Sequence, residues 1–253
     1  CLVGSEMCIR DRHMAGHSKW ANIKHKKERQ DAKRGKIFTK IIREITGATK
    51  QGGPDTNTNS RLRMAIDKAI NVNMPKDTIQ RAIDKGIGAI EGGDYIELRY
   101  EGYGPGGSAV IVECLTDNKT RTIAEIRHIF SKYGAHLGTD GSVSFQFKRL
   151  GYLLFAADTN EDALLEAALE YGADDVIRHD DIVEVIVSPS QFSVLKDHLA
   201  NQGFCAQEAD ITMRADNEVL LNTDDAKKMQ VFIDALEELD DVQEVHTSAL
   251  LDF

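Results

Sequence analysis

The side chains best suited to chemistry in this sequence are cations, and they gather in one stretch, residues 14–50. This stretch holds eleven Lys or Arg against three acids, a net charge of +8, whereas the whole chain of 253 residues carries −10. Lysine and arginine neutralise phosphates, so a concentrated positive field predicts a polyanionic partner. We therefore predict that the stretch binds nucleic acid. The candidate contact residues are Lys19, Trp20, Lys24, His25, Lys26, Lys27, Arg29, Lys33, Arg34, Lys36, Lys40 and Arg43.

Two features of this stretch leave alternatives open. A run of positive charge is often only a solvated face. Against this, residues 14–90 have a net charge of +10 and residues 91–253 one of −20, a separation that a uniformly solvated surface does not explain. Trp20, the only tryptophan, either stacks on a base or, as is more common, anchors the segment to its own domain. Residues 17–36 are accordingly either a helix or a basic arm that orders on contact.

Residues suited to catalysis or metal binding form no recognisable set. His17 and His25 are eight positions apart, and no cysteine or carboxylate has the spacing that would complete a zinc site with them. The His-Asp-Asp run at 179–181 is interpreted as a β-turn and the acidic pair at 240–241 as a helix-end turn. We expect no metal, no cofactor, no small-molecule substrate and no enzymatic activity.

Composition restricts the class of protein. Hydrophobic residues make up 42 % of the sequence and prolines number four, which is typical of a globular protein of two or three domains. No apolar run approaches the roughly 18 residues needed to cross a bilayer, so we expect no membrane partner. Cys114 and Cys205 lie far apart, which indicates buried thiols in a reducing compartment. Residues 1–13 precede a plausible start at Met14 and resemble translated vector sequence, so we exclude them from the fold prediction.

A bundle of three short helices is predicted over residues 14–92. Apolar residues recur at helical spacing over 37–45 and form one stripe. Lys36, Lys40 and Arg43 fall off that stripe, so burying it would display these three cations together.

Two further helices complete the predicted bundle. A polar loop over 47–60 leads to a helix over 61–73, which Asn59 or Ser60 can cap. Pro75 begins a third helix, which a glycine ends. The residues of the second helix expected to face inward are Leu62, Ala65, Ile66, Ala69 and Ile70.

A glycine-rich loop follows the first predicted strand. The simpler interpretation of residues 101–107 is a wide hairpin loop. A phosphate-cradling loop is the sharper hypothesis, but the P-loop pattern is missing and no helix follows directly. The candidate partner-contact residues of this loop are Tyr100, Gly102, Tyr103, Gly104, Pro105, Gly106 and Gly107.

The rest of the chain is predicted to form two α/β domains. Residues 150–217 follow the order β-α-β-β-α-β, which is that of a ferredoxin-like sandwich, and begin with a strand over 152–156. Residues 93–149, which end in a separate strand over 142–148, lack a second helix and a fourth strand. Residues 218–253 supply one of each, so we predict a discontinuous domain with 150–217 inserted in it. The fold class is α+β and multidomain.

Four segments resemble the YebC/PmpR family, which also includes the mitochondrial translational activator of cytochrome c oxidase. They are MAGHSKWANIKHKKERQDAKRGKIFTKIIREI at 14–45, NMPKDTIQRAIDKG at 73–86, YEGYGPGG at 100–107 and LGTDGSVSFQF at 137–147. The resemblance implies an N-terminal helical bundle and two α/β domains, the third inserted in the second. It also implies a cytoplasmic, non-enzymatic regulator that binds DNA.

Three hypotheses for function remain. A DNA-binding regulator requires base-edge readers besides phosphate contacts, and the candidates are Asn22, Arg29 and Gln30. A ribosome- or RNA-associated translation factor, such as one that relieves stalling at proline-rich stretches, can recognise shape and phosphate alone. A protein-only adaptor would not depend on the basic stretch.

Overall fold

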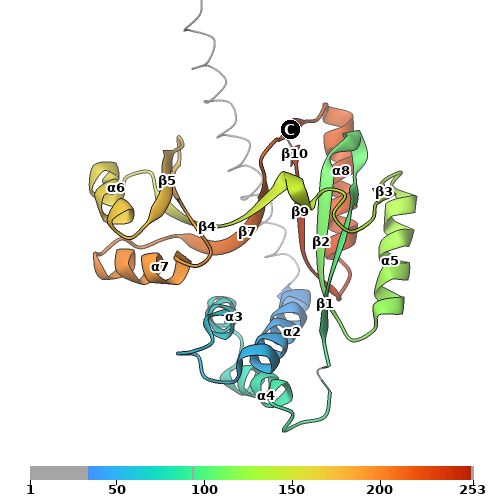
Figure 1. Ribbon diagram of the computed structural model, residues 1–253, viewed down its shortest axis with the longest axis horizontal. Coiled ribbons are helices and arrows are strands. Elements are labelled where there is room, and N and C mark those ends of the chain that lie inside the picture. Colours follow the sequence, from blue (N-terminus) through green and yellow to red (C-terminus); the bar gives the residue numbers. More distant parts are fainter. Residues whose placement is uncertain (1–33, 93, 252–253) are drawn as a thin grey trace, which may run out of the picture. The chain divides into compact units, whose positions relative to one another are not determined.

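The computed structural model describes residues 34–92 and 94–251, which fall into two compact units (Figure 1). One unit consists of residues 146–218. The other contains the described residues on either side of it.

Within the described residues, three helices form a bundle, as predicted: α2 (Arg34–Gly52), α3 (Ser60–Asn71) and α4 (Lys76–Gly86). Thr46 and Thr49 of α2 are buried, and the Thr46 hydroxyl donates to the carbonyls of Ile42 (2.8 Å) and Ala82 (3.1 Å). The core of the bundle consists of Ile41, Ile45, Ala48, Leu62, Ala65, Ala69, Met74, Ile79 and Ala82.

Two predictions about this bundle were wrong. The polar loop begins only after Gly52, because the small residues at 46–49 pack against α4 and keep α2 helical. Ile70 was expected to face inward, but 59 % of it is exposed. Leu62, Ala65 and Ala69 occupy the buried face of α3, and Ile70 lies one position, or about 100°, away from it. Asn59 caps α3, because its Oδ1 accepts from the Leu62 N–H at 3.0 Å.

An antiparallel sheet follows the bundle in the same unit. Its strands β1 (Ile96–Tyr103), β2 (Ala109–Thr116), β3 (His136–Leu137) and β9 (Val242–Thr247) lie in the order β3-β1-β2-β9. Helices α5 (Lys119–Lys132) and α8 (Thr223–Glu237) share one hydrophobic core with the sheet (Figure 1). The short strands β8 (Val219–Leu220) and β10 (Ala249–Leu250) pair in parallel. The C-terminal part of the chain thus supplies a helix and an edge strand to a sheet that begins at Ile96, as the pairing of Val112 with Val245 illustrates.

Residues 146–218 fold as a ferredoxin-like sheet with two helices. The elements are β4 (Phe147–Ala156), α6 (Glu161–Glu170), β5 (Ala173–Arg178), β6 (Ile182–Val187), α7 (Phe192–Asn201) and β7 (Glu208–Ala215). The strands lie in the order β5-β6-β4-β7 and all pairs are antiparallel. The α+β fold class predicted from the sequence is therefore confirmed.

The strand predicted over 152–156 is confirmed as part of a longer strand, β4. The separate strand predicted over 142–148 is wrong, because β4 begins only at Phe147. Ser144–Gln146 form a short 3-10 turn ahead of it. Gly151, which separated the two predicted strands, lies inside β4 against the ring of Phe192. A Cβ at this position would lie 2.5 Å from Phe192 Cδ2, so glycine allows the close approach of α7 instead of ending the strand.

Candidate nucleic-acid interface

Most of the predicted contact residues lie outside the described residues: Lys19, Trp20, Lys24, His25, Lys26, Lys27, Arg29 and Lys33. Arg34 begins α2. The described part of the basic stretch is therefore α2, with Lys36, Lys40, Arg43 and Lys50.

Lys36, Lys40 and Arg43 lie along one side of α2 and contact the chain where α8 ends. Lys36 Nζ donates to the Glu238 carbonyl at 2.8 Å, and Lys40 Nζ donates to the Glu237 carbonyl at 3.0 Å. Arg43 Nη1 donates to the Asp240 carbonyl at 2.7 Å. The last carbonyls of a helix lack partners within the helix and carry partial negative charge, so cations stabilise them. As predicted, the three cations lie together on one side of α2, but this side faces the end of α8.

Arg43 also belongs to a buried network centred on Asp241, which is 2 % exposed. Its Nη1 lies 2.5 Å from Asp241 Oδ1. Arg121 of α5 donates to the same carboxylate, with Nη2 2.8 Å from Oδ2, and the Thr122 hydroxyl donates to Oδ2 at 2.8 Å. Burial alone would raise the pKa of Asp241, but the bonds from Arg121, Thr122 and Arg43 outweigh it, and the pKa is lowered. The carboxylate therefore stays ionised and joins α2 to α5.

The side chain of Arg43 is 13 % exposed, and its hydrogen bonds to Asp240 and Asp241 lie within the chain. It fixes the direction of α2 relative to the sheet. The partner at 241 was missed because an Asp-Asp pair after a helix resembles an ordinary polar turn. The sequence carries no local signal that one of the two acids is buried.

Two exposed cations of the bundle lie on α4. Residues 60–86 hold six Lys or Arg against three Asp, a net charge of +3. Lys76 and Arg81 are exposed, whereas Arg61 forms an ion pair with Glu97 at the start of β1. The candidate residues predicted from the sequence left out Lys76 and Arg81, although the charge count over 14–90 includes them.

The glycine-rich loop after β1 is tied into the fold. The carboxylate of Glu101 is buried and accepts from the backbone N–H groups of Val143 (2.8 Å) and Ser144 (2.9 Å). Burial would raise the pKa of Glu101, but these backbone bonds prevail and lower it. The Tyr103 hydroxyl donates to the Ser142 carbonyl at 3.2 Å. The segments at 100–107 and 137–147 are therefore held to each other.

The backbone N–H groups of this loop are the donors that the phosphate-cradle hypothesis would use. The N–H of Gly104 donates to the Ser108 carbonyl at 2.8 Å, and that of Gly107 donates to Gly104 at 3.1 Å, so both donors are used inside the loop. The connection between β1 and β2 is a compact turn, not the wide hairpin loop that was predicted, because β1 extends to Tyr103. Among the candidate partner-contact residues, Gly106 and Gly107 are exposed, and Tyr100, Gly102, Tyr103, Gly104 and Pro105 are buried or half-buried.

A second buried carboxylate lies in the unit of residues 146–218. Glu184 on β6 forms an ion pair with Arg214 of β7, and its Oε2 lies 3.4 Å from His179 Nε2. Burial opposes ionisation of Glu184, but the bonds from His179 and Arg214 lower its pKa to about 2. His179, predicted to lie in a turn, thus also faces a buried acid. Arg214 also lies over the ring of Tyr152, 5.4 Å from its centroid.

Within the part of the chain that the structure describes, no three His, Cys, Asp or Glu side chains lie close enough to hold a metal ion. None of the helices in the described ranges is both long and apolar enough to cross a membrane.

Comparison with known proteins places the chain in one protein family. The family model described as the TACO1/YebC protein N-terminal domain matches residues 18–89, and the TACO1/YebC second and third domain matches residues 95–249. The chain belongs to the TACO1/YebC family. The resemblance noted in the sequence is thereby confirmed.

Individual relatives of this TACO1/YebC chain agree along nearly their whole length. A probable transcriptional regulatory protein of Laribacter hongkongensis is 63 % identical over 94 % of this chain and 100 % of its own. One of Neisseria meningitidis serogroup B is 61 % identical over 94 % of this chain and 99 % of its own. The crystal structure of a conserved hypothetical protein from Aquifex aeolicus superposes with a TM-score of 0.77 at 44 % identity, covering 87 % of this chain and 91 % of that one.

Proposed function

We propose that this TACO1/YebC chain is a non-enzymatic, cytoplasmic regulator of gene expression that binds DNA through its N-terminal part. Its relatives in Laribacter and Neisseria are named probable transcriptional regulatory proteins, which supports a regulatory role. The observation that carries the proposal is the separation of charge, +10 over residues 14–90 and −20 over residues 91–253. A polyanion is attracted to the first part and repelled by the second.

The bound phosphates are assigned to two groups of cations. The first is the basic run at 19–33, and the second consists of Lys76 and Arg81 on α4, which are exposed. Lys36, Lys40 and Arg43 are instead bound to the chain after α8, and their role in the proposal is to hold α2 in one direction. The proposal also includes the domain arrangement, in which residues 93–149 and 218–253 form one domain and residues 150–217 are inserted in it. These residues make up the acidic part of the chain.

The salt dependence of binding tests the proposal. Each neutralised phosphate contributes roughly −0.9 to the slope of log K against log salt for duplex DNA. Replacing Lys24, Lys26, Lys27 and Arg29 together by Ala should flatten that slope by about two to four units. The matched control removes four cations from the acidic part, Lys119, Lys132, Lys227 and Lys228, and should leave the slope unchanged. Equal slopes for the two variants would reject the basic run as the contact.

The kind of nucleic acid is tested in cells. After crosslinking, the full chain is purified and the attached nucleic acid is sequenced. Discrete promoter fragments are expected for a DNA-binding regulator. Predominantly ribosomal RNA would contradict DNA as the partner.

A further inference from the structure

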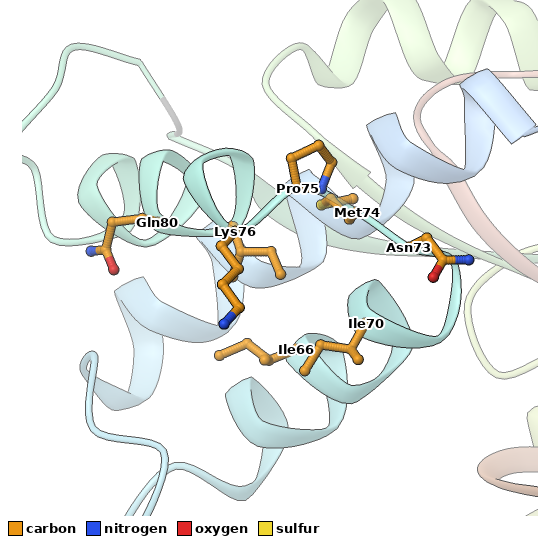
Figure 2. Close-up of a pocket in the computed structure, with 8 residues that line it drawn as sticks. Ile66, Ile70, Asn73, Met74, Pro75, Lys76 and Gln80 are labelled. Atoms are coloured by element: carbon orange, nitrogen blue, oxygen red, sulfur yellow. The ribbon is translucent and has the colours of Figure 1, made fainter.

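A groove opens in the bundle where α3 ends and α4 begins. It has a volume of about 610 Å³ and is lined on its apolar side by Ile66, Ile70, Met74 and Ile79 (Figure 2). Ile66 and Ile70 lie side by side along α3, and the other two come from the turn and from α4. The groove belongs to the bundle alone.

One residue of the groove is more exposed than its type favours. Ile70 has 59 % of its surface exposed, the largest value for an aliphatic side chain of the described bundle. A single exposed isoleucine is unremarkable by itself. An exposed isoleucine beside a second one in a concave surface is a ready contact for a flat apolar ligand.

Polar side chains stand around this apolar surface. Asn73 has a φ of 57°, in the left-handed region that asparagine tolerates better than most residues, and this turn places it at one end of the groove. Gln80 lies at the other end, and Lys76 extends from α4 toward Ile66 (Figure 2). Gln80 Nε2 donates to Asp84 Oδ1 at 2.9 Å, which holds its amide in place.

We propose that this groove takes an unpaired nucleobase of single-stranded nucleic acid. The flat ring would lie on Ile66 and Ile70, as flipped or single-stranded bases lie on apolar side chains in other proteins. The Asn73 amide would pair with the base edge, because asparagine both donates and accepts as bases require. Lys76 would contact the adjoining phosphate. The inference rests on the proposed function and adds to it a site that distinguishes single strands from duplexes.

The charges and shape favour a base over a protein helix. The surrounding segment, residues 60–86, has a net charge of +3, which suits a phosphate backbone. A helix bound in a groove needs pockets for successive turns. Here Lys76 extends across the space between α3 and α4, so the apolar surface is short.

Two single strands of twelve nucleotides separate bases from phosphates. One carries all its bases, and the other has three abasic units at its centre, which keep the phosphates and remove the rings. We expect wild type to bind the complete strand at least about fivefold more tightly, in line with the effect of losing one stacked base. Ile70→Gln should abolish this preference. The control Ile87→Gln changes an equally accessible isoleucine, 52 % exposed just beyond α4, and should retain it.

A charge variant and a folding check complete the test. Lys76→Ala should weaken binding of both strands alike and flatten the salt slope by about one unit. Circular dichroism and thermal melting confirm that each variant is folded, which is expected because both isoleucines are exposed. Oligomeric state is measured by sedimentation for wild type and Ile70→Gln.

The outcomes separate the two proposals. If wild type binds both strands equally, or if Ile70→Gln keeps the preference, the groove is not a base site, while binding to nucleic acid still stands. If wild type binds neither strand nor a duplex in dilute salt, the proposed function fails and the groove inference fails with it. A change of oligomeric state in Ile70→Gln without loss of base preference would assign the groove to a second copy of the chain and overturn the inference.

Discussion

Arg43 and Asp241 form a buried ion pair, with Nη1 2.5 Å from Oδ1, although 198 positions separate them in the sequence. The pair joins α2 to the turn that precedes β9, an edge strand of the sheet β3-β1-β2-β9. Arg121 and Thr122 of α5 bind the same carboxylate. The contact therefore joins α2, α5 and the turn before β9.

Removing the Asp241 charge is expected to destabilise the fold strongly. Asp241→Asn leaves Arg43 without its buried counter-charge and should lower the free energy of unfolding by about 3 kcal/mol. The control is Asp117→Asn, because Asp117 is exposed and pairs with the same Arg121 at 2.8 Å. That variant should lose about 0.5 kcal/mol. Urea denaturation of both variants measures the difference, and equal losses would show that the buried pair has no special role.

The cations Lys36 and Lys40 are expected to affect stability and not binding. Each donates to a carbonyl at the C-terminal end of α8, so Lys36→Ala and Lys40→Ala should each cost about 0.5 kcal/mol. The slope of nucleic-acid affinity against salt should stay at the wild-type value. Urea denaturation and salt titration of the same two variants check this, and a flatter slope would return these lysines to the binding surface.

Acid should destabilise the fold through Glu184. Its pKa is lowered to about 2 in the folded chain from an ordinary value of 4.5. A group with a lowered pKa stabilises fully above the unfolded value, so this contribution is present above about pH 4.5 and is lost as the pH falls toward 2. By linkage it amounts to about 3 kcal/mol.

Glu184→Gln measures that contribution. The variant should be less stable than wild type at pH 7, and the difference should shrink on acidification between pH 4.5 and 2, as followed by urea denaturation at each pH. Glu161→Gln is the control, because Glu161 pairs with Arg178 on the surface, with 42 % of its side chain exposed. If the stability gap for Glu184→Gln is constant over this window, the carboxylate does not titrate with the lowered pKa.

Two glycines of the bundle should respond oppositely to alanine. A Cβ on Gly86 would lie 2.5 Å from Thr49 Cβ and 2.8 Å from the Thr46 carbonyl oxygen, so Gly86→Ala should force α4 away from α2 and cost about 2 kcal/mol. A Cβ on Gly47 would meet Leu115 at an ordinary 3.4 Å. Because Gly47 lies inside α2, Gly47→Ala should stabilise by about 0.5 kcal/mol. Thermal melting of both variants checks the prediction, and destabilisation by Gly47→Ala would place the end of α2 before this residue.

The elements were predictable because their signals are local. The apolar stripe over 37–45 reflects a periodicity that neighbouring residues set, and the cap at Asn59 acts on a residue three positions away. Residues 150–217 could be assigned to a ferredoxin-like sheet because strand and helix order restricts the topology. Ile70 was misplaced because a one-residue offset on a helix decides between core and surface.

The site was less predictable because it depends on contacts between distant segments. Lys36, Lys40 and Arg43 were correctly placed on one side of a helix, but the sequence does not indicate that α8 ends beside them. Asp241 and Glu184 resemble the other 39 acids of the chain until the fold buries them. Charge counts predict that the chain attracts a polyanion. Only the tertiary structure shows which cations are already bonded to carbonyl and carboxylate groups of the chain itself.

The central claim, that nucleic acid contacts the basic N-terminal part, is tested most directly by ultraviolet crosslinking followed by peptide mapping. The full chain is irradiated with bound DNA, digested, and the crosslinked peptides are identified by mass spectrometry. We predict crosslinks in peptides from residues 19–33 and 60–86, and none from residues 146–218. Crosslinks confined to residues 146–218 would contradict the account.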